Sequence, residues 1–509
     1  MESRDAGEPQ GALALEPEAD RRWLLPRAAV WPLVIMAVGV LVALFVRAPG
    51  LVIFFAGYVW LAFTALDVSL AAFVLVASIP LGLTLHGHTV AYSDLMAIAM
   101  ALGLLWKHRD AGLKQVAARV FPRAWAAPLV ALLFFAVLSL LHAQSRLGAT
   151  VKILELIEFF VVIVAVAADM GLSHKSWRLV MLALFISGAA MAVYGIVQFL
   201  WALGPPSFQV YSDHVRASGT YGQPNVFGAF MEQLLPLGIA ILILGPKAPR
   251  ARPWLTGALV LIALGVWVSF SRGAWVADVA AIGLMGLFVY ANRRSVVAPY
   301  IGWGIVMPLV LFGVATLLGK VHIAPNFVAA HSKHYSVGGR LASITNGLHS
   351  YDNQQRLLIW HSALTAIRQH LLTGVGMGEF HNWIATRMPK GLVGVPPQAS
   401  NLYLEIGADT GVFGIVAIIW LQYRWFAQTV KAIWGRFGSL DPWFYALAVG
   451  SLGIFTAFSV HNLVDYMIDH GVIIPLLLAM GVIAAIVREG ARPPAAAAAS
   501  PQPEGAEHA

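Results

Sequence analysis

The residues best suited to chemistry lie in one long polar segment, residues 319–414, of an otherwise apolar chain. This segment contains seven of the sixteen histidines: His322, His331, His334, His349, His361, His370 and His381. Its arginines include Arg340 and Arg356. Such groups can donate, accept or move a proton, and polar connections between membrane-embedded segments are where a site is expected. We predict that the functional site lies here and in the loops on the same side of the bilayer.

Two arginines in shorter polar connections predict an anion site. Arg216 is followed by Gly219 and Gly222, and glycines permit tight turns that bring backbone N–H groups close to a ligand. Arg272 lies within residues 269–275, SFSRGAW, between two apolar spans. An arginine held at such a place usually has a partner. The alternative at both places is an ordinary turn whose arginine extends towards water.

An amphipathic helix is predicted within the long polar segment, in the sequence DNQQRLLIWHSALTAIRQH. Its apolar residues recur at helical spacing: Leu357, Trp360, Leu364, Ile367 and Leu371. Arg356 and His361 lie elsewhere around the turn. We expect this helix to lie against the mouth of a helix bundle or at the lipid interface.

Two further motifs follow this helix. GVGMGEF, residues 374–380, lacks the preceding strand and the lysine of a phosphate-binding loop. It instead predicts a tight turn that presents Glu379 and His381. SNLYLEIGADTGVFG then opens an apolar span, with Ser400 or Asn401 as the expected helix N-cap.

Composition places the elements that must position these residues in a membrane. The chain is 59% hydrophobic and 11% charged, has a mean hydropathy of +0.75, and repeats apolar runs of about 20 residues. It is therefore predicted to be all-α, a polytopic transmembrane helix bundle of about 12–14 helices. The charge of +8 forms no continuous face, which argues against nucleic-acid binding. With no cysteine, no disulfide is possible, and neither a metal nor another cofactor is predicted.

Charge distribution orients the bundle. Most basic residues fall between apolar spans on the side of the amino-terminal tail, which predicts that both termini are cytoplasmic and the long polar segment lies on the far side. The predicted parts are a disordered tail at 1–27, eleven transmembrane helices at 28–318, a large outer loop containing helices at 319–401, three transmembrane helices at 402–488, and a disordered Ala/Pro tail at 489–509.

Several sequence pieces, taken in order, resemble the O-antigen ligase and O-antigen polymerase superfamily, which also contains protein O-oligosaccharyltransferases. They are RASGTYGQPNVFG, SFSRGAWVA, the helix of Arg356 through GVGMGEF, SNLYLEIGADTGVFG and HNLVDY. The resemblance covers about residues 140–475. It implies a C-type membrane glycosyltransferase that moves a glycan from undecaprenyl diphosphate to an acceptor hydroxyl. The reaction would occur at the periplasmic face of the bacterial inner membrane, without a metal.

Site residues follow from the same resemblance. Arg216 and Arg272 match the family arginines that hold the donor diphosphate, and we add Arg340 and Arg356 to this predicted set. Ser400 occupies the position at which ligases carry a histidine as general base. A serine hydroxyl cannot act as the base unaided, so a neighbour must take the proton or little base assistance is needed. The remaining predicted residues are Glu379, His381, His361 and Asn401 for catalysis, and Gln223, Asn225 and Tyr403 for substrate binding.

Several functions remain open at this point. The absence of the ligase histidine favours polymerisation of O-antigen or exopolysaccharide repeat units. Ligation to lipid A core and transfer to protein hydroxyls are the alternatives, so the acceptor is a glycan, a lipid A core or a protein. A transporter is the alternative of another class, and Lys152, Glu155 and Glu158 in a predicted span are its best candidates. These three residues are close enough along a helix to pair with each other instead.

Overall fold

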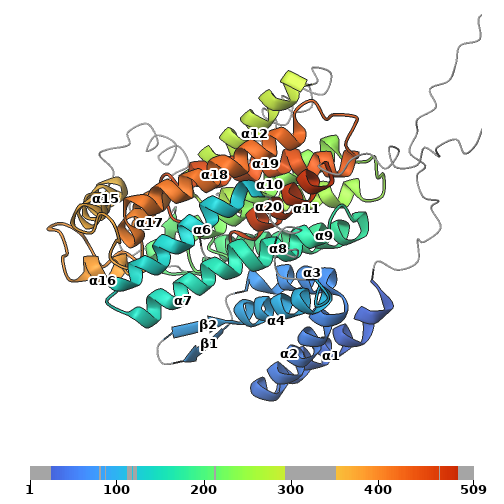
Figure 1. The fold of residues 1–509 in the computed structure, drawn as a ribbon, viewed down its shortest axis with the longest axis horizontal. Helices are drawn as coiled ribbons and strands as arrows, with labels where there is room; N and C mark the ends of the chain where they lie inside the picture. The colour runs from blue at the N-terminus through green and yellow to red at the C-terminus, as the bar shows by residue number, and fades with distance from the viewer. Residues whose placement is uncertain are drawn as a thin grey trace, which may run out of the picture.

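The protein is a bundle of α-helices, as predicted (Figure 1). This computed structural model describes residues 25–79, 82–85, 88–111, 117, 123–210, 214–292, 351–468 and 471–490. The first half contains α1 (Arg27–Ala43), α2 (Arg47–Thr64), α3 (Leu66–Ala77), α4 (Tyr92–Lys107), α6 (Arg123–Leu138), η1 (Ser139–Leu141), α7 (Arg146–Ile157), η2 (Glu158–Ile163), α8 (Val164–Asp169) and α9 (His174–Leu200). The second half contains η3 (Pro206–Phe208), α10 (Pro224–Leu244), α11 (Arg252–Val268), α12 (Arg272–Asn292), α15 (Tyr351–Gln369), α16 (Phe380–Ala385), α17 (Leu402–Thr410), α18 (Val412–Ile433), α19 (Pro442–His461) and α20 (Ile474–Gly490).

Strands are limited to two short antiparallel hairpins in the described part of the chain. β1 (Gly82–Leu85) pairs with β2 (His88–Ala91), with Gly82 opposite Ala91. β3 (Gln209–Val210) pairs with β4 (His214–Val215) just before Arg216. The second hairpin therefore leads the chain directly to a predicted site residue.

Among the described helices, six are long and apolar enough to cross a membrane. They are α2, residues 124–141, α9, α10, α12 and α19. This finding supports the predicted polytopic bundle. The predicted span at 299–318, the first part of the predicted outer loop with Arg340, and both predicted tails lie outside the described residues, apart from residues 25–27 and 489–490.

Helices α10 and α19 form the centre of the bundle. In α10, 83% of the spanning window is buried, and in α19 78%, against 28% in α2. A helix that is apolar on all sides is stable only when it is buried or in lipid. Gly453 of α19 lies against Pro236 of α10, where an added Cβ would come within 2.6 Å of the proline Cβ. Small residues thus let the two helices approach closely.

The predicted span at 402–423 is interrupted. The chain breaks at Gly411, whose φ of +80° separates the nine-residue α17 from α18. A Cβ at Gly411 would lie 2.6 Å from the carbonyl oxygen of Leu371, so a larger residue has no room there. Because of this break, α17 is a separate short helix that packs against α15 and α18.

The helix predicted around Arg356 is present as α15, but of the predicted apolar face only Ile367 is fully buried. Leu357, Leu364 and Leu371, predicted as part of the apolar face, are each at least 42% exposed. The buried face consists of Ile359, Ser362, Ala363, Ala366 and Ile367. Small alanines let α15 lie close to α17, whereas the leucines remain on the outer surface, as a helix at a lipid interface requires.

The α10–α19 contact predicts a specific loss of stability. Gly453→Leu forces a side chain against Pro236 and Met285, so we expect a destabilisation of about 1–3 kcal/mol and a lower melting temperature in detergent. Gly257→Leu on α11 is the matched control, because an added Cβ there meets no atom within 4 Å. Equal melting temperatures for the two variants would contradict this account of the packing.

Candidate active site

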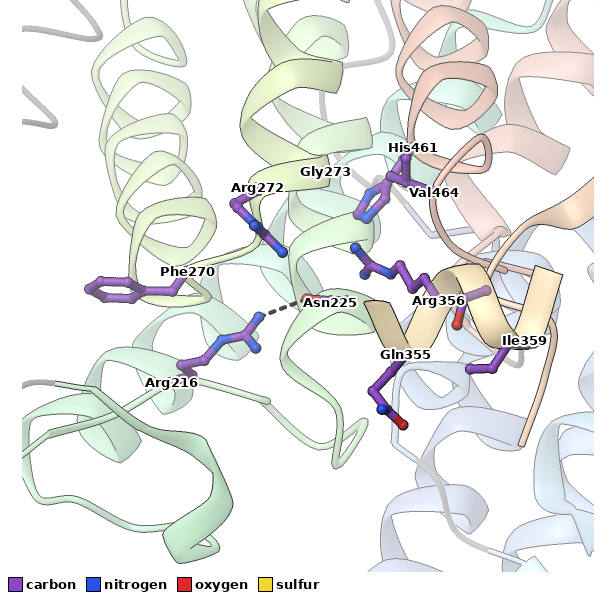
Figure 2. A pocket seen from close by; sticks show the side chains of 11 residues that line it. Arg216, Asn225, Phe270, Arg272, Gly273, Gln355, Arg356, Ile359, His461 and Val464 are labelled. Atoms are coloured by element: carbon purple, nitrogen blue, oxygen red, sulfur yellow. Dashed lines mark hydrogen bonds between the residues drawn. The ribbon is translucent and has the colours of Figure 1, made fainter. Parts of the chain in front are cut away.

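Several segments that are distant in sequence line one cavity of about 290 Å³ (Figure 2). The connection after β4, the start of α10, the turn into α12, α15, the residue before α17, and the end of α19 all contribute. The lining residues are Arg216, Asn225, Phe270, Arg272, Gly273, Gln355, Arg356, Ile359, Ser400, His461 and Val464. The structure therefore brings together five of the predicted site residues: the arginines Arg216, Arg272 and Arg356, and the polar residues Asn225 and Ser400.

Arg216 is fixed by both its backbone and its guanidinium. Its backbone N–H donates to the carbonyl of Phe208 at 2.8 Å, which continues the β3–β4 hairpin. Its Nε donates to the carbonyl of Ser269 at 2.9 Å, and its Nη2 donates to Oδ1 of Asn225 at 2.7 Å. The charge is thereby held at the cavity wall without a carboxylate in either of these bonds.

The glycine turn after Arg216 has a different role from the predicted one. Oε1 of Gln198 on α9 accepts hydrogen bonds from the backbone N–H groups of Ser218 and Gly219, at 3.1 and 2.8 Å. These two N–H groups therefore bond to the protein, whereas the prediction placed them near a ligand. Gly219 has a φ of +56°, and a Cβ there would come within 2.6 Å of Phe227. The glycine shapes the turn that delivers Arg216.

Arg272 is the first residue of α12, after a sharp turn. Phe270 in this turn has a φ of +51°, a left-handed conformation that non-glycine residues rarely adopt. Oγ of Ser269 accepts from the N–H of Ser271 at 3.1 Å and stabilises the turn. Nη2 of Arg272 reaches Oδ1 of Asn353, at 3.4 Å. Strained backbone of this kind tends to occur at functional sites, where the surrounding structure holds it.

Arg356 comes from α15 and approaches the other two arginines across the cavity (Figure 2). Its Nη2 lies 3.7 Å from Oδ2 of Asp465, and the same oxygen accepts from Nδ2 of Asn225 at 2.8 Å. Asp465 and Asn225 thus connect Arg356 to Arg216. None of the described lining residues is acidic, so the cavity has the charge and the donor geometry to bind an anion such as a phosphate.

A buried histidine, His461, lines the same cavity and pairs with a buried glutamate, Glu232, behind it. Nδ1 of His461 lies 2.7 Å from Oε2 of Glu232, and each side chain is only 1% exposed. The ring lies against Gly273, where an added Cβ would be 2.5 Å from Nε2 of His461. In the sequence, His461 is marked only as part of HNLVDY. A stronger signal was Glu232 itself, because an acidic residue within an apolar span requires a partner.

Ser400 and Asn401 lie at the start of α17. Ser400 lines the cavity with a φ of +50°, and its carbonyl accepts from Nε1 of Trp360 at 3.3 Å. Asn401 is the N-cap, as predicted: its Oδ1 accepts from the N–H groups of Tyr403 and Leu404. Neither Tyr403, whose hydroxyl donates to Gln422, nor the exposed Gln223 belongs to the described cavity lining.

The structure does not bring Glu379, His381 or His361 to the described cavity lining. Glu379 is 3% exposed and accepts from the backbone N–H of Ser145 at 3.2 Å. Nδ1 of His381 lies 2.8 Å from the carbonyl of Pro396, and His361 is exposed on α15. Their role in proton transfer stays a prediction.

The GVGMGEF segment forms the predicted tight turn. The backbone N–H groups of Gly378 and Phe380 donate to the carboxylate of Asp409, at 2.7 and 3.2 Å. The N–H of Gly376 donates to the backbone carbonyl of Asp409 at 3.0 Å. This segment therefore wraps the end of α17 and holds the helix whose start carries Ser400.

A second pair of histidines lies apart from the described cavity lining. The rings of His142 and His370 are 5.4 Å apart, and Nδ1 of His142 lies 2.9 Å from the hydroxyl of Thr373. Burial, together with the nearby His142 and Arg387, lowers the pKa of His370.

The described fold is that of a multi-pass membrane protein, and three arginines line one of its cavities. Residues 257–419 match the family model described as O-antigen ligase. This match supports the superfamily that the motifs predicted, and it contains Arg272, Arg356 and Ser400, whereas Arg216 precedes it. Members of this family are ligases and polymerases of glycosyltransferase type, which supports an enzymatic role. No curated protein shows a significant match to the chain.

The arginine cavity predicts binding of inorganic pyrophosphate to the purified protein. Arg272→Gln removes charge-assisted hydrogen bonds, each of about 1.5–3 kcal/mol, so we expect at least an approximately tenfold weaker affinity by calorimetry. Arg178→Gln is the control. Arg178 is exposed near the start of α9, and the opposite end of this helix, at Gln198, is the one that contacts the turn at the cavity. Unchanged affinity in Arg272→Gln would contradict the assignment.

Proposed function

We propose that this protein is a glycosyltransferase that takes a glycan from undecaprenyl diphosphate and gives it to an acceptor hydroxyl at the periplasmic face of the bacterial inner membrane. We further propose that it is a polymerase of O-antigen or exopolysaccharide repeat units. The observation that carries this proposal is the convergence of Arg216, Arg272 and Arg356 on one cavity without an acidic residue among its described lining.

The chemistry of the reaction explains why such a cavity is needed. When the anomeric C–O bond breaks, negative charge develops on the departing lipid diphosphate. Guanidinium groups already placed around that charge stabilise the transition state more than the ground state. Arginine remains charged at the membrane surface and binds two phosphate oxygens at once. The bonds from Arg216 to Ser269 and Asn225 support this function, since they orient the guanidinium before the substrate arrives.

The acceptor distinguishes the possible members of the family. Ser400, at the position of the ligase histidine, favours a polymerase, in which the acceptor is another lipid-linked glycan. Ligation to lipid A core and transfer to a protein hydroxyl use the same donor and remain the alternatives. No nucleic acid takes part in any of these reactions.

The residues that suggested a transporter have a local explanation. Nζ of Lys152 lies 2.8 Å from Oε2 of Glu155, three residues further along α7. This pair neutralises two of the three charges that made the span unusual. An ion pathway requires groups at the membrane midplane, whereas Lys152 is about half exposed. The glycosyltransferase therefore accounts for more of the structure.

Replacement of a cavity arginine should abolish glycan transfer. We expect Arg216→Ala and Arg272→Ala to lower turnover of an undecaprenyl-diphosphate-linked oligosaccharide by about 10²–10³-fold, as loss of one transition-state donor does in other enzymes. Product analysis by gel and mass spectrometry gives the rate, and the melting temperature in detergent confirms that each variant is folded. Arg178→Ala should keep the parent rate. Wild-type turnover in both cavity variants would refute the diphosphate site.

The acceptor can be tested in the same assay. A polymerase forms laddered products when the purified protein is incubated with the lipid-linked oligosaccharide alone. Reaction only after addition of lipid A core identifies a ligase, and reaction only after addition of a protein acceptor identifies an oligosaccharyltransferase. The first result is the one we expect.

A further inference from the structure

We infer that His461, held by Glu232, is the general base that removes the proton from the acceptor hydroxyl. This inference rests on the proposed glycan transfer. It supplies a general base, the role that a serine at position 400 cannot fill unaided. It assigns a catalytic role to the end of α19, which lies outside the residues matched by the family model.

The position of His461 is the first argument. The residue lines the cavity that contains Arg216, Arg272 and Arg356. In Figure 2 its ring extends from the end of α19 towards the space between Arg272 and Arg356. A diphosphate bound by the arginines would place the anomeric carbon next to this space. The acceptor hydroxyl must approach that carbon, and the ring is placed to meet it.

The partner of His461 sets its protonation. A carboxylate accepts hydrogen bonds, so the 2.7 Å contact between Oε2 of Glu232 and Nδ1 of His461 places the imidazole proton on Nδ1. In the neutral imidazole, Nε2 is then the nitrogen with a lone pair. Because both side chains are only 1% exposed, water competes little for this bond and the ring orientation is fixed. Glu232 is a positioning residue that also stabilises the imidazolium once it forms.

In the transfer step, the acceptor oxygen forms a bond to the anomeric carbon while the bond from that carbon to the diphosphate oxygen breaks. The electron pair of the broken bond remains on the diphosphate, whose charge the arginines stabilise. The hydroxyl proton passes to Nε2 of His461 and later leaves to water. No metal, oxidant or further reactant is needed.

The neighbours of His461 fit this role. Gly273 lies directly against the ring, since a Cβ there would be 2.5 Å from Nε2. Any larger residue at this position would collide with the imidazole, so the glycine gives the ring its place at the cavity wall. The other histidines predicted for catalysis, His361 and His381, are outside the described lining of the cavity. His461 is thus the histidine that the described cavity presents to a substrate.

Azide provides a direct test, because it is a nucleophile that carries no proton to remove. In purified protein with undecaprenyl-diphosphate-linked oligosaccharide, His461→Gln should lower transfer to the hydroxyl acceptor by about 10²–10⁴-fold, the usual contribution of a general base. Donor affinity should stay within about twofold of the wild type. Added azide should restore turnover and give a glycosyl azide, identified by mass spectrometry. Glu232→Gln should show a smaller loss of kcat, unchanged KM and the same response to azide.

The control is a second histidine–carboxylate pair, which lies at the opposite end of α19. Nε2 of His174, which begins α9, lies 3.4 Å from Oδ2 of Asp441, the N-cap of α19. His174→Gln should keep the parent rate without azide. Gly273→Ala keeps both residues of the site pair but puts a methyl group 2.5 Å from Nε2, so the imidazole must move and transfer should be lost even if His461→Gln fails to fold.

Two results would overturn the inference while leaving the proposed function intact. One is a wild-type rate in His461→Gln or Gly273→Ala. The other is a loss of transfer that azide does not restore, which would give His461 a structural role. Absence of both donor binding and transfer in the wild-type protein would instead refute the proposed function, and this inference with it.

Discussion

Mutual repulsion of three guanidinium groups is the constraint that the rest of the site must overcome. Arg216, Arg272 and Arg356 share one cavity of about 290 Å³. Like charges so close together in a partly desolvated place oppose folding unless each is held by other bonds. The protein holds them from separate rigid elements: a hairpin and its glycine turn, the first residue of a long helix, and a helix packed on α17. Asp465 and Asn225 connect two of them.

The central helices explain how this charge is kept in place. Helices α10 and α19 pack closely through glycines and carry, at their ends beside the cavity, Asn225 on one and His461 on the other. Because both helices are almost entirely buried, their ends move little relative to each other. The arginine site and the His461–Glu232 pair are therefore built on the same rigid contact. In the proposed reaction, binding of the leaving group and removal of the proton would therefore occur in one fixed geometry.

Much of the fold could be predicted from hydrophobic run length, since lipid imposes helices of about 20 apolar residues. The cavity arginines Arg216 and Arg272 could also be predicted, because a cation in a short loop between apolar spans is unusual. Residue type predicted the N-cap as Ser400 or Asn401, and the structure identifies it as Asn401. The break at Gly411 could not be predicted, because the close contact with Leu371 that requires it comes from a distant segment. The same holds for the buried face of α15, which depends on the shape of α17.

The His461–Glu232 pair shows the other limit of sequence reasoning. The two residues are 229 positions apart, and the sequence around either one does not indicate that the other is its partner. Glu379 and His381 were predicted for catalysis because they stand together in a polar turn. In the structure their polar atoms instead bond to Ser145 and Pro396. Glu379 and His381 are close in sequence, and this closeness suggested a catalytic role. His461 and Glu232 are close only in space, because α10 and α19 pack together.

The amide oxygen atoms that hold the arginines have one more consequence. Asn225 accepts from Arg216, and Asn353 accepts from Arg272. A neutral carboxamide orients a guanidinium but attracts it less strongly than an ionised oxygen does. In the proposed reaction, an arriving diphosphate would compete with these two amide oxygens for the guanidinium groups. Release of the lipid carrier would then let the carboxamides orient the arginines again.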